Sequence, residues 1–267
     1  MPEMPELEGL RAVLGPVVVG RTIEDVAVSP KFGFLLRTPP DDLSRALVGG
    51  TVERMWRRGK FLVFDVGERR LVINPMLGGR LHWATRAEKP PPAWLFGLGL
   101  DDGHVLRLTD FARMARVYLV DAATVDSVPG WSELGPDADS VSFEEFAQRI
   151  RRHPGELKNL LRNQAFIAGI GNAYSDEILH EARLLPLRKR STLTPDELRA
   201  LYDATTKVLA ESTAAILSQP GYVPHKQDRS YMKVHLHGGE PCPRCGHLVA
   251  EISARGEVFN FCRGCQK

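Results

Sequence analysis

The amino-acid sequence predicts an α+β protein in which a strand-rich part precedes a helical part. Short apolar or alternating runs such as "KFLVFDV", "HVLRLTD" and "ARVYLV" recur within residues 1–120, each bounded by Gly, Pro, Asp or Arg. Such runs are typical of antiparallel strands in a sandwich or a barrel-like sheet. Beyond residue 140 the apolar residues take helical spacing, and all four cysteines lie in the last 26 residues. The sequence therefore predicts strands first, helices next and a small cysteine module at the end.

Length and composition exclude several classes of protein. The chain has 267 residues, enough for one or two domains, and its 43% hydrophobic and 25% charged residues are typical of a globular protein. No apolar run approaches the roughly 20 residues of a membrane span, and no signal peptide is recognisable. We expect a cytoplasmic protein without a membrane anchor. Basic clusters at 54–60, 149–152 and 188–190 together favour a polyanion-binding surface, although a single cluster is usually a solvated face.

The first ten residues, "MPEMPELEGL", hold two prolines and three glutamates. Apolar residues at helical spacing from Leu7 to Leu14 predict a first helix, and proline suits the first turn of a helix. A chemical interpretation is also open, because without Met1 the chain would begin with the free secondary amine of Pro2. The residues around it do not decide between the two interpretations.

The strand-rich part is predicted to follow this helix and to end near residue 125. The stretch "GPVVVGRTIEDVAV" changes to β-branched residues, and the proline run at 90–92 fits an exposed loop. The stretch "DSVPGWSELGPDADS" at 126–140 is rich in residues that break regular structure. We therefore predict a linker there.

Helix-start signals mark the part that follows, at 141–230. Ser142 is a predicted N-cap, with Glu145 at the spacing of a capping box. Thr194 and Pro195 form a similar start for a long final helix.

The stretch "AFIAGIGNAYSDEIL" predicts two helices separated by a glycine turn. Gly169 and Gly171 break the helical pattern, and Asn172 is placed as the N-cap of the second helix. The exposed N–H groups of such a turn, with the Asn172 amide, would suit a phosphate oxygen. The glycines could equally serve close packing between the helices.

The cysteines have the spacing C-x2-C-x16-C-x2-C, which predicts a zinc site. The four ligands would be Cys242, Cys245, Cys262 and Cys265. Four thiolates complete a tetrahedron and leave no open position, so we expect one structural zinc ion per chain. Two disulfides or four unrelated thiols are the alternatives, and a cytosolic location disfavours disulfides. The stretch "LVAEISARGEVFNFC" between the cysteine pairs predicts a hairpin that turns at Arg255 and Gly256.

Four motifs follow one another along the chain: "PEMPELE" at the N-terminus, "RRGKFL" at 57–62, "QAFIAGIGNAYSDEIL" at 164–179, and the terminal "CPRCG" with "FCRGCQK". Together they resemble the formamidopyrimidine-DNA glycosylase and endonuclease VIII family of base-excision repair enzymes. The resemblance spans nearly the whole chain, and the β-rich segment between motifs is its least distinctive part.

The resemblance implies the architecture in more detail. It implies an eight-stranded β-sandwich catalytic domain at 1–125, the linker at 126–140, a helix-two-turns-helix domain at 141–230 and a four-cysteine zinc finger at 231–267. DNA would lie in the cleft between the domains. The implied activity is that of a bifunctional DNA glycosylase and AP lyase, which excises an oxidised base and then cleaves the abasic site.

The resemblance also implies roles for single residues. Pro2 would be the nucleophile, because a terminal α-amine has a pKa near 7.7–8.0 and is about a tenth unprotonated at pH 7. Glu3 would be the acid/base partner and would need a raised pKa. Lys60 would hold a phosphate beside the damaged nucleotide, and Lys158 and Asn172 would add further phosphate contacts. The damaged base would have to leave the stack.

The sequence departs from the family pattern where the lesion would be recognised. Leu77 stands where members acting on oxidised purines carry Met, and Ala112 and Met114 stand where their Arg and Phe pair would fall, with Arg113 between them. Loss of that arginine would weaken recognition of the base opposite the lesion. We expect Leu77, Arg113 and Met114 to contact DNA, and Leu77 is more similar to the endonuclease VIII branch. Simple core packing is the alternative for the apolar residues.

The finger departs as well. Glu257 stands where the family carries a phosphate-binding Arg, and Arg255 lies two residues earlier. Either Arg255 reaches the same phosphate from a longer hairpin, or the contact is lost. A glutamate that faced a phosphate would be repulsive.

Three functions remain open from the sequence. The leading hypothesis is the glycosylase with lyase activity, acting as a monomer on double-stranded DNA that contains an oxidised base or an abasic site. The second keeps only the AP-lyase activity. The third is a binder of damaged DNA without catalysis, which the Pro2, Glu3 and Lys60 set disfavours because a binder needs no nucleophile. The preferred lesion, the opposite base and any protein partner are not decided.

Overall fold

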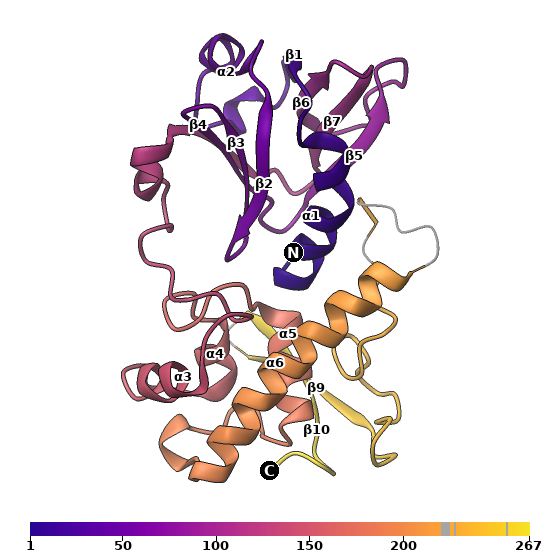
Figure 1. The fold of residues 1–267 in the computed structure, drawn as a ribbon. Coiled ribbons are helices and arrows are strands. Elements are labelled where there is room, and N and C mark those ends of the chain that lie inside the picture. Colours follow the sequence, from indigo (N-terminus) through magenta and orange to yellow (C-terminus); the bar gives the residue numbers. More distant parts are fainter. Residues whose placement is uncertain (220–224, 227, 255) are drawn as a thin grey trace. The chain divides into compact units, whose positions relative to one another are not determined.

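The computed structural model describes residues 1–219, 225–226, 228–254 and 256–267. The chain forms two compact units, which are described separately (Figure 1). The first unit contains Met1–Ser132 and Ile216–Gln227, and the second contains Glu133–Ala215 and Asp228–Lys267. Within these described ranges, no helix combines the length and the apolar character needed to cross a membrane.

The first unit is built on two four-stranded antiparallel sheets, with strand orders β1-β6-β7-β5 and β2-β3-β4-β8. Buried side chains from both sheets belong to one hydrophobic cluster, so the sheets share a core. This confirms the predicted eight-stranded β-sandwich. The strands are β1 Ile23–Val28, β2 Val52–Arg58, β3 Phe61–Val66, β4 Arg69–Asn74, β5 Gly79–Thr85, β6 Trp94–Leu100, β7 His104–Asp110 and β8 Arg116–Asp121.

Two helices cover this core. Helix α1 (Met4–Val18) packs against β2 and β3, and its buried apolar residues recur every three or four positions, from Leu7 to Val18. It is longer than the predicted Leu7–Leu14 because Val18 continues the buried face. Helix α2 (Pro40–Leu47) has only 8 residues, too few for a clear periodicity, and was not predicted.

The second unit begins with the predicted helices. They are α3 Phe143–Ile150, α4 Leu157–Arg162, α5 Asn172–Glu181 and α6 Pro195–Ser218. The Ser142 hydroxyl accepts a hydrogen bond of 3.2 Å from the N–H of Glu145, which confirms the predicted cap of α3. The Thr194 hydroxyl caps α6 in the same way, and Pro195 is its first residue. Short 3-10 segments complete the helical structure of the described chain, at Gly33–Leu35, Ala122–Ser127 and Arg190–Thr192.

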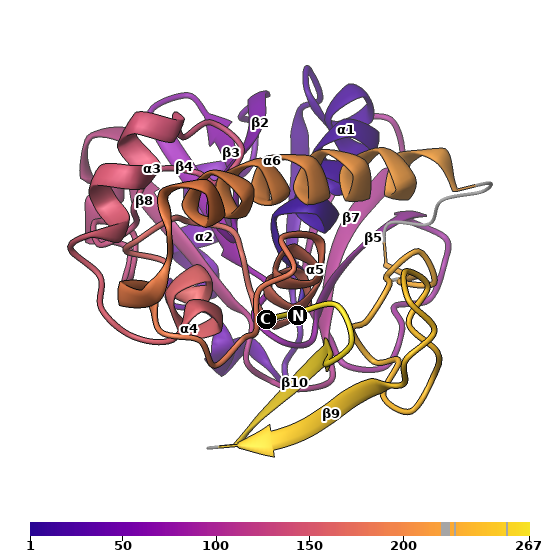
Figure 2. The ribbon, with the colours of Figure 1, turned by 90° about the horizontal axis from the view of Figure 1, so that it is seen from below.

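A two-stranded hairpin follows, formed by β9 (Val249–Ala254) and β10 (Glu257–Cys262). Its position between the two cysteine pairs agrees with the predicted hairpin. Helix α5 contacts both α4 and β10, so the helix after the glycine turn lies against the cysteine module (Figure 2).

Candidate active site and metal centre

The N-terminal end of α1 places Pro2 and Glu3 in buried positions. The Glu3 side chain is 2% exposed and lies at the N-cap of α1. Its backbone N–H donates to the Glu6 carboxylate at 2.9 Å, and the Glu3 carboxylate in turn accepts from the N–H of Glu6. This reciprocal capping box fixes the first turn of the helix. Met1 is still joined to Pro2 in the structure, so the Pro2 nitrogen belongs to a peptide bond until Met1 is removed.

A partly buried ion pair joins α1 to β2. Arg57, whose side chain is 3% exposed, donates from Nε to the Glu8 carboxylate at 2.7 Å. Burial by itself would raise the pKa of Glu8, but hydrogen bonds from Arg11 and Arg57 outweigh it and lower this pKa. Glu8 is therefore ionised near neutral pH and holds Arg57 against the helix that begins with Pro2 and Glu3.

The same arginine reaches the turn that carries Lys60. In the β2–β3 hairpin Arg58 pairs with Phe61, which leaves Gly59 and Lys60 as a two-residue turn. Gly59 has φ +54°, as tight hairpin turns require. The Arg57 guanidinium also donates to the Gly59 carbonyl at 3.1 Å. The sequence predicted Pro2, Glu3 and Lys60 as one site, and the Glu8–Arg57 pair ties together the two elements that carry them.

Asp110, at the end of β7, shapes the loop that carries Arg113 and Met114. Its buried carboxylate accepts hydrogen bonds from the N–H groups of Ala112, Met114 and Ala115, at 2.5 to 2.9 Å. Three donors on one carboxylate fix a tight loop, in which Arg113 has φ +56°. Arg113 is exposed, and its guanidinium lies 5.2 Å from the centre of the Phe32 ring; Met114 is half-buried.

Leu77 lies on the neighbouring loop, between β4 and β5. Its side chain is 50% exposed. Gly78 lies so close to the Asp110 loop that an added Cβ would stand 2.1 Å from the Asp110 carboxylate and 2.8 Å from the Ala112 side chain. The two loops are therefore packed together, and Gly79 pairs with Asp110 where β5 and β7 meet.

Phe111 is a residue that the sequence reasoning missed. It is 73% exposed, the highest exposure of any large hydrophobic residue that the structure describes, and it follows Asp110 directly. Exposed apolar side chains on two loops that pack together, Phe111 on one and Leu77 on the other, are unusual for a surface without a partner. The sequence does show an aromatic residue directly after the aspartate that ends a strand. The strand pattern gave no indication that the Phe111 side chain would be exposed.

The glycine turn between α4 and α5 is held by Gln164, which the sequence reasoning also missed. The Gln164 amide donates to the carbonyl of Ile170 at 2.7 Å, and its oxygen accepts from the N–H of Gly169 at 2.9 Å. Gly169 has φ +105°, so the turn needs a glycine there. Gly171 is the N-cap, and α5 begins at Asn172, one residue earlier than predicted.

Asn172 and Lys158, both predicted phosphate contacts, have different surroundings. Asn172 is half-buried, and its Oδ1 has no hydrogen-bond partner among the described residues. Lys158 is wholly buried, and its ammonium donates to Asp176 at 2.6 Å and to the carbonyl of Val258 at 2.7 Å. Burial lowers the pKa of Lys158, and the Asp176 carboxylate opposes this shift. The structure thus does not place the Lys158 ammonium on the surface.

The tip of the hairpin is described only in part. Arg255, a predicted DNA contact, lies outside the described residues. Glu257 forms an ion pair with Arg162 at the end of α4. This carboxylate is therefore neutralised by a partner within its own unit.

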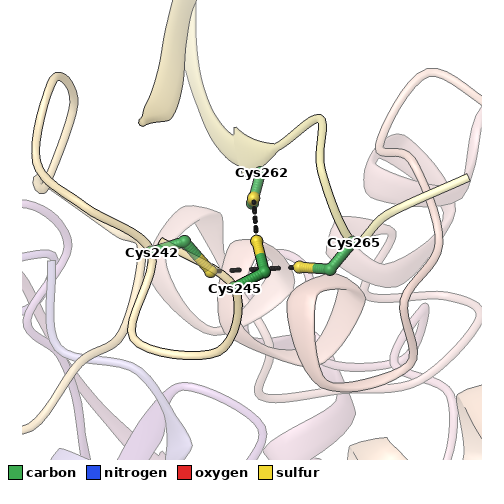
Figure 3. Close-up of side chains that lie close together, drawn as sticks. All are labelled: Cys242, Cys245, Cys262 and Cys265. Atoms are coloured by element: carbon green, nitrogen blue, oxygen red, sulfur yellow. Dashed lines mark hydrogen bonds between the residues drawn. The ribbon is translucent and has the colours of Figure 1, made fainter. Parts of the chain in front are cut away.

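The four cysteines converge as their spacing predicted (Figure 3). Their sulfur atoms all lie within 4.8 Å of one another, with 3.9 Å between Cys242 and Cys265 and 3.3 Å between Cys245 and Cys262. A tetrahedral zinc ion with Zn–S bonds of about 2.3 Å needs sulfur atoms roughly 3.8 Å apart. The cluster fits one zinc ion held by four thiolates, with no open position.

His180 on α5 lies beside this cluster. Its Nε2 is 3.3 Å from the sulfur of Cys242 and 3.7 Å from that of Cys265. Burial, with smaller contributions from Arg244 and Lys233, lowers the pKa of His180 to about 4, so the ring is neutral near pH 7. An N–H at Nε2 is suited to donate to the thiolates, which is a common arrangement around metal ligands.

Family models match the chain over most of its length. The formamidopyrimidine-DNA glycosylase N-terminal domain matches residues 1–117, and the formamidopyrimidine-DNA glycosylase H2TH domain matches residues 134–219. The zinc finger found in FPG and IleRS matches residues 239–267. These matches agree with the resemblance that the four motifs indicated.

Curated relatives match from end to end. The formamidopyrimidine-DNA glycosylase of Heliobacterium modesticaldum is 36% identical over 282 residues and covers 100% of both chains. That of Lactobacillus delbrueckii subsp. bulgaricus is 32% identical over 276 residues, again with 100% coverage of both.

Solved structures share the fold. A Lactococcus lactis FPG (MutM) in complex with FAPY-dG-containing DNA superposes with a TM-score of 0.90 at 25% identity, covering 99% of this chain and 100% of the other. A MutM structure in complex with DNA that contains carbocyclic 8-oxo-G superposes with a TM-score of 0.90 at 24% identity, with 100% coverage of both chains.

The Glu8–Arg57 pair predicts a pH-dependent part of the stability. Because the pKa of folded Glu8 is lowered, its contribution is fully present above the unfolded pKa of about 4.3 and is lost as the pH falls through the folded value. Replacing Glu8→Gln should cost about 1.5–3 kcal/mol at pH 7. Urea unfolding at a series of pH values should show this difference shrinking below about pH 4.

Arg11→Gln is the matched control, because Arg11 pairs with the same carboxylate but is 47% exposed. It should cost no more than about 1 kcal/mol. A Glu8→Gln cost that stayed constant down to about pH 3 would contradict the assigned pair.

The cysteine cluster predicts that the second unit depends on metal. Purified protein should contain one zinc ion per chain, and a strong chelator should melt the hairpin, because structural zinc contributes about 10–16 kcal/mol in finger peptides. Elemental analysis measures the zinc content, and amide hydrogen exchange of β9 and β10 measures the order of the hairpin. Unchanged exchange in metal-free protein would contradict a structural role.

Proposed function

The chain belongs to the formamidopyrimidine-DNA glycosylase family, and from this premise we propose that it is a bifunctional DNA glycosylase and AP lyase of base-excision repair. Its substrate is double-stranded DNA that contains an oxidised base or an abasic site. The observation that carries the proposal is the Pro2–Glu3 pair at the start of α1, tied through Glu8 and Arg57 to the turn that carries Lys60. We propose that the protein acts as a monomer, and the bacterial sources of the relatives support action on the chromosome in the cytoplasm.

The reaction begins at Pro2 once Met1 has been removed. The secondary amine attacks C1′ of the damaged nucleotide and loses its proton, the C1′–N bond to the base breaks, and the base departs with a proton. The C1′–O4′ bond of the sugar ring then breaks as O4′ takes up a proton, which leaves an iminium between the Pro2 nitrogen and C1′. The resulting iminium has no N–H proton to lose and stays cationic, so it withdraws electrons from C2′. Loss of a C2′ proton then expels the 3′ phosphate, and a second elimination expels the 5′ phosphate. Covalent catalysis of this kind divides one difficult step into easier ones.

Glu3 acts as the acid and base of this sequence. Its carboxyl group is buried beside Pro2 at the N-cap of α1, where it can protonate the sugar ring oxygen and then take up the C2′ proton. Lys60 holds a phosphate next to the damaged nucleotide from its tight turn. Asn172 donates from its side-chain Nδ2–H group to a second phosphate, together with the N–H groups at the start of α5; the turn fixed by Gln164 supports this role.

Leu77 and Phe111 form the wedge that occupies the space left by the flipped nucleotide. Proteins that distort DNA insert exposed apolar side chains between base steps, and these two side chains are exposed on loops packed together through Gly78 and Asp110. Phe111 takes the place that the sequence assigned to Met114, which is half-buried. Arg113 remains exposed beside the wedge and contacts the DNA backbone or the opposite base.

The zinc ion has no step in the reaction. When bound, it holds the hairpin that follows α5, because its four thiolate ligands leave no position for substrate. The chemistry belongs to the N-terminal unit.

Borohydride trapping tests the function. With abasic DNA the native protein should give a covalent adduct, whereas Pro2→Gly should give much less adduct and retain its affinity. Glu3→Gln should slow base excision by about 10²–10⁴-fold, the usual contribution of a general acid or base. Mass spectrometry first confirms that Met1 has been removed.

Each outcome is decisive. If the protein forms an adduct with abasic DNA but releases no oxidised purine or pyrimidine from a panel of duplexes, its activity is that of an AP lyase alone. If protein from which Met1 has been removed forms no adduct, the protein is a binder of damaged DNA without catalysis. Equal loss of trapping and affinity in Pro2→Gly would overturn the role of Pro2.

The wedge is tested by Phe111→Ala. Stacking on an aromatic side chain contributes about 1–3 kcal/mol per base, so the affinity for abasic DNA should fall by the corresponding factor. Phe34→Ala is the control, because Phe34 is 69% exposed on the same unit and belongs to the 3-10 segment Gly33–Leu35, outside both loops. Phe111→Trp should restore the affinity. Equal effects of the Phe34 and Phe111 variants would contradict the assignment.

A further inference from the structure

Lys158 is the most completely buried cation of the second unit, among the residues that the structure describes. It lies on α4 with its side chain 0% exposed, although lysine is rarely buried. Its ammonium donates to Asp176 on α5 at 2.6 Å and to the carbonyl of Val258 on β10 at 2.7 Å. It also lies 4.5 Å from the centre of the Phe259 ring. One side chain on α4 thus links the next helix, α5, to strand β10, which lies 100 residues further along the chain at Val258.

The carboxylates of α5 extend this link to the segment before the cysteine module. The second oxygen of Asp176, itself wholly buried, lies 3.0 Å from Nδ1 of His235. The adjacent Glu177 accepts hydrogen bonds of 2.8 to 2.9 Å from the N–H groups of Lys233, Val234 and His235. Helix α5 therefore holds the chain on its way into the hairpin, while Lys158 holds the returning strand.

A second cation of α4 binds the same strand. Arg162, one helical turn after Lys158, pairs with Glu257 at the start of β10. The two cations thus reach consecutive residues of the strand, Glu257 and Val258. The Arg162 pair is partly exposed and the Lys158 pair is buried, so most of the constraint comes from Lys158.

We infer that Lys158 is a positioning residue that fastens the zinc-bearing hairpin to helices α4 and α5, on either side of the glycine turn, and that it does not bind phosphate. This deepens the proposed function and rests on it for the DNA measurements alone. A cation that binds a DNA phosphate displaces the counterions around that phosphate, so its charged group must be accessible to the DNA. The Lys158 ammonium is instead shielded from solvent and contacts a carboxylate, a backbone carbonyl and an aromatic ring. Without Lys158 the hairpin would become ordered only when DNA binds. The free-energy cost of this ordering weakens the affinity for DNA, although no contact between a charge and a phosphate is lost.

The experiment separates a clamp from a phosphate contact. Lys158→Met is compared with the native zinc-bound protein on a duplex that carries a stable abasic analogue, and Kd is measured over a series of salt concentrations. We expect Kd to rise while the slope of log Kd against log salt stays unchanged and the single-turnover rate at saturating DNA is retained. Without DNA, amides of β9 and β10 should exchange faster by at least about tenfold. A slope reduced by about 0.9 would show that Lys158 contacts a phosphate and would overturn the inference.

Further variants keep the test decisive. If Lys158→Met fails to fold because Asp176 is left as an unpaired buried charge, Lys158→Met with Asp176→Asn removes both charges and is measured instead. Arg162→Ala is the matched control from the same helix face, and it should change hairpin exchange by no more than about twofold. Lys60→Met should reduce the slope if Lys60 contacts a phosphate, so its failure would count against the proposed function alone. Hairpin exchange that is unchanged in both Lys158 variants would also overturn the inference.

Discussion

A buried charge is stable in a protein only when its hydrogen-bonding groups are satisfied, and this constraint fixes each of the segments to which we assign a function. In the first unit, the Glu8 carboxylate and the Arg57 guanidinium join the first helix to the turn that carries Lys60. The Asp110 carboxylate accepts three backbone N–H groups and sets the loop beyond β7. In the second unit, Lys158 and Asp176 join α4 and α5 to the hairpin. Each arrangement would be costly to break because one group would remain buried without a partner.

The same constraint decides which cations are held inside their own unit. The family resemblance implied that Lys158 contacts a phosphate, yet its side chain is wholly buried, and Arg162 on the same helix pairs with Glu257. Lys60 and Asn172, to which we assign phosphate contacts, lie at a tight hairpin turn and at the start of a helix. Internal pairing thus occupies two cations of the second unit, Lys158 and Arg162.

The cysteine module is small, and metal and helix both hold it. Its apolar cluster contains only four buried residues among those described, Val234, Cys242, Val249 and Cys262, so zinc provides much of the order that a larger core would provide elsewhere. Helix α5 contributes His180 beside the thiolates and Glu177 against the preceding backbone. Helix α5, which begins at the glycine turn, therefore also orders the cysteine module.

The sequence by itself determined the succession of strands, helices and hairpin, the caps at Ser142 and Thr194, and the zinc ligands. These features depend on local periodicity, on capping chemistry and on cysteine spacing, all of which act over a few residues. Only the tertiary structure decided that Lys158 is buried, that Glu257 has a partner in Arg162 and that Phe111 is exposed. Exposure and charge pairing depend on residues up to 100 positions apart, such as Lys158 and Val258, and no local pattern encodes such contacts.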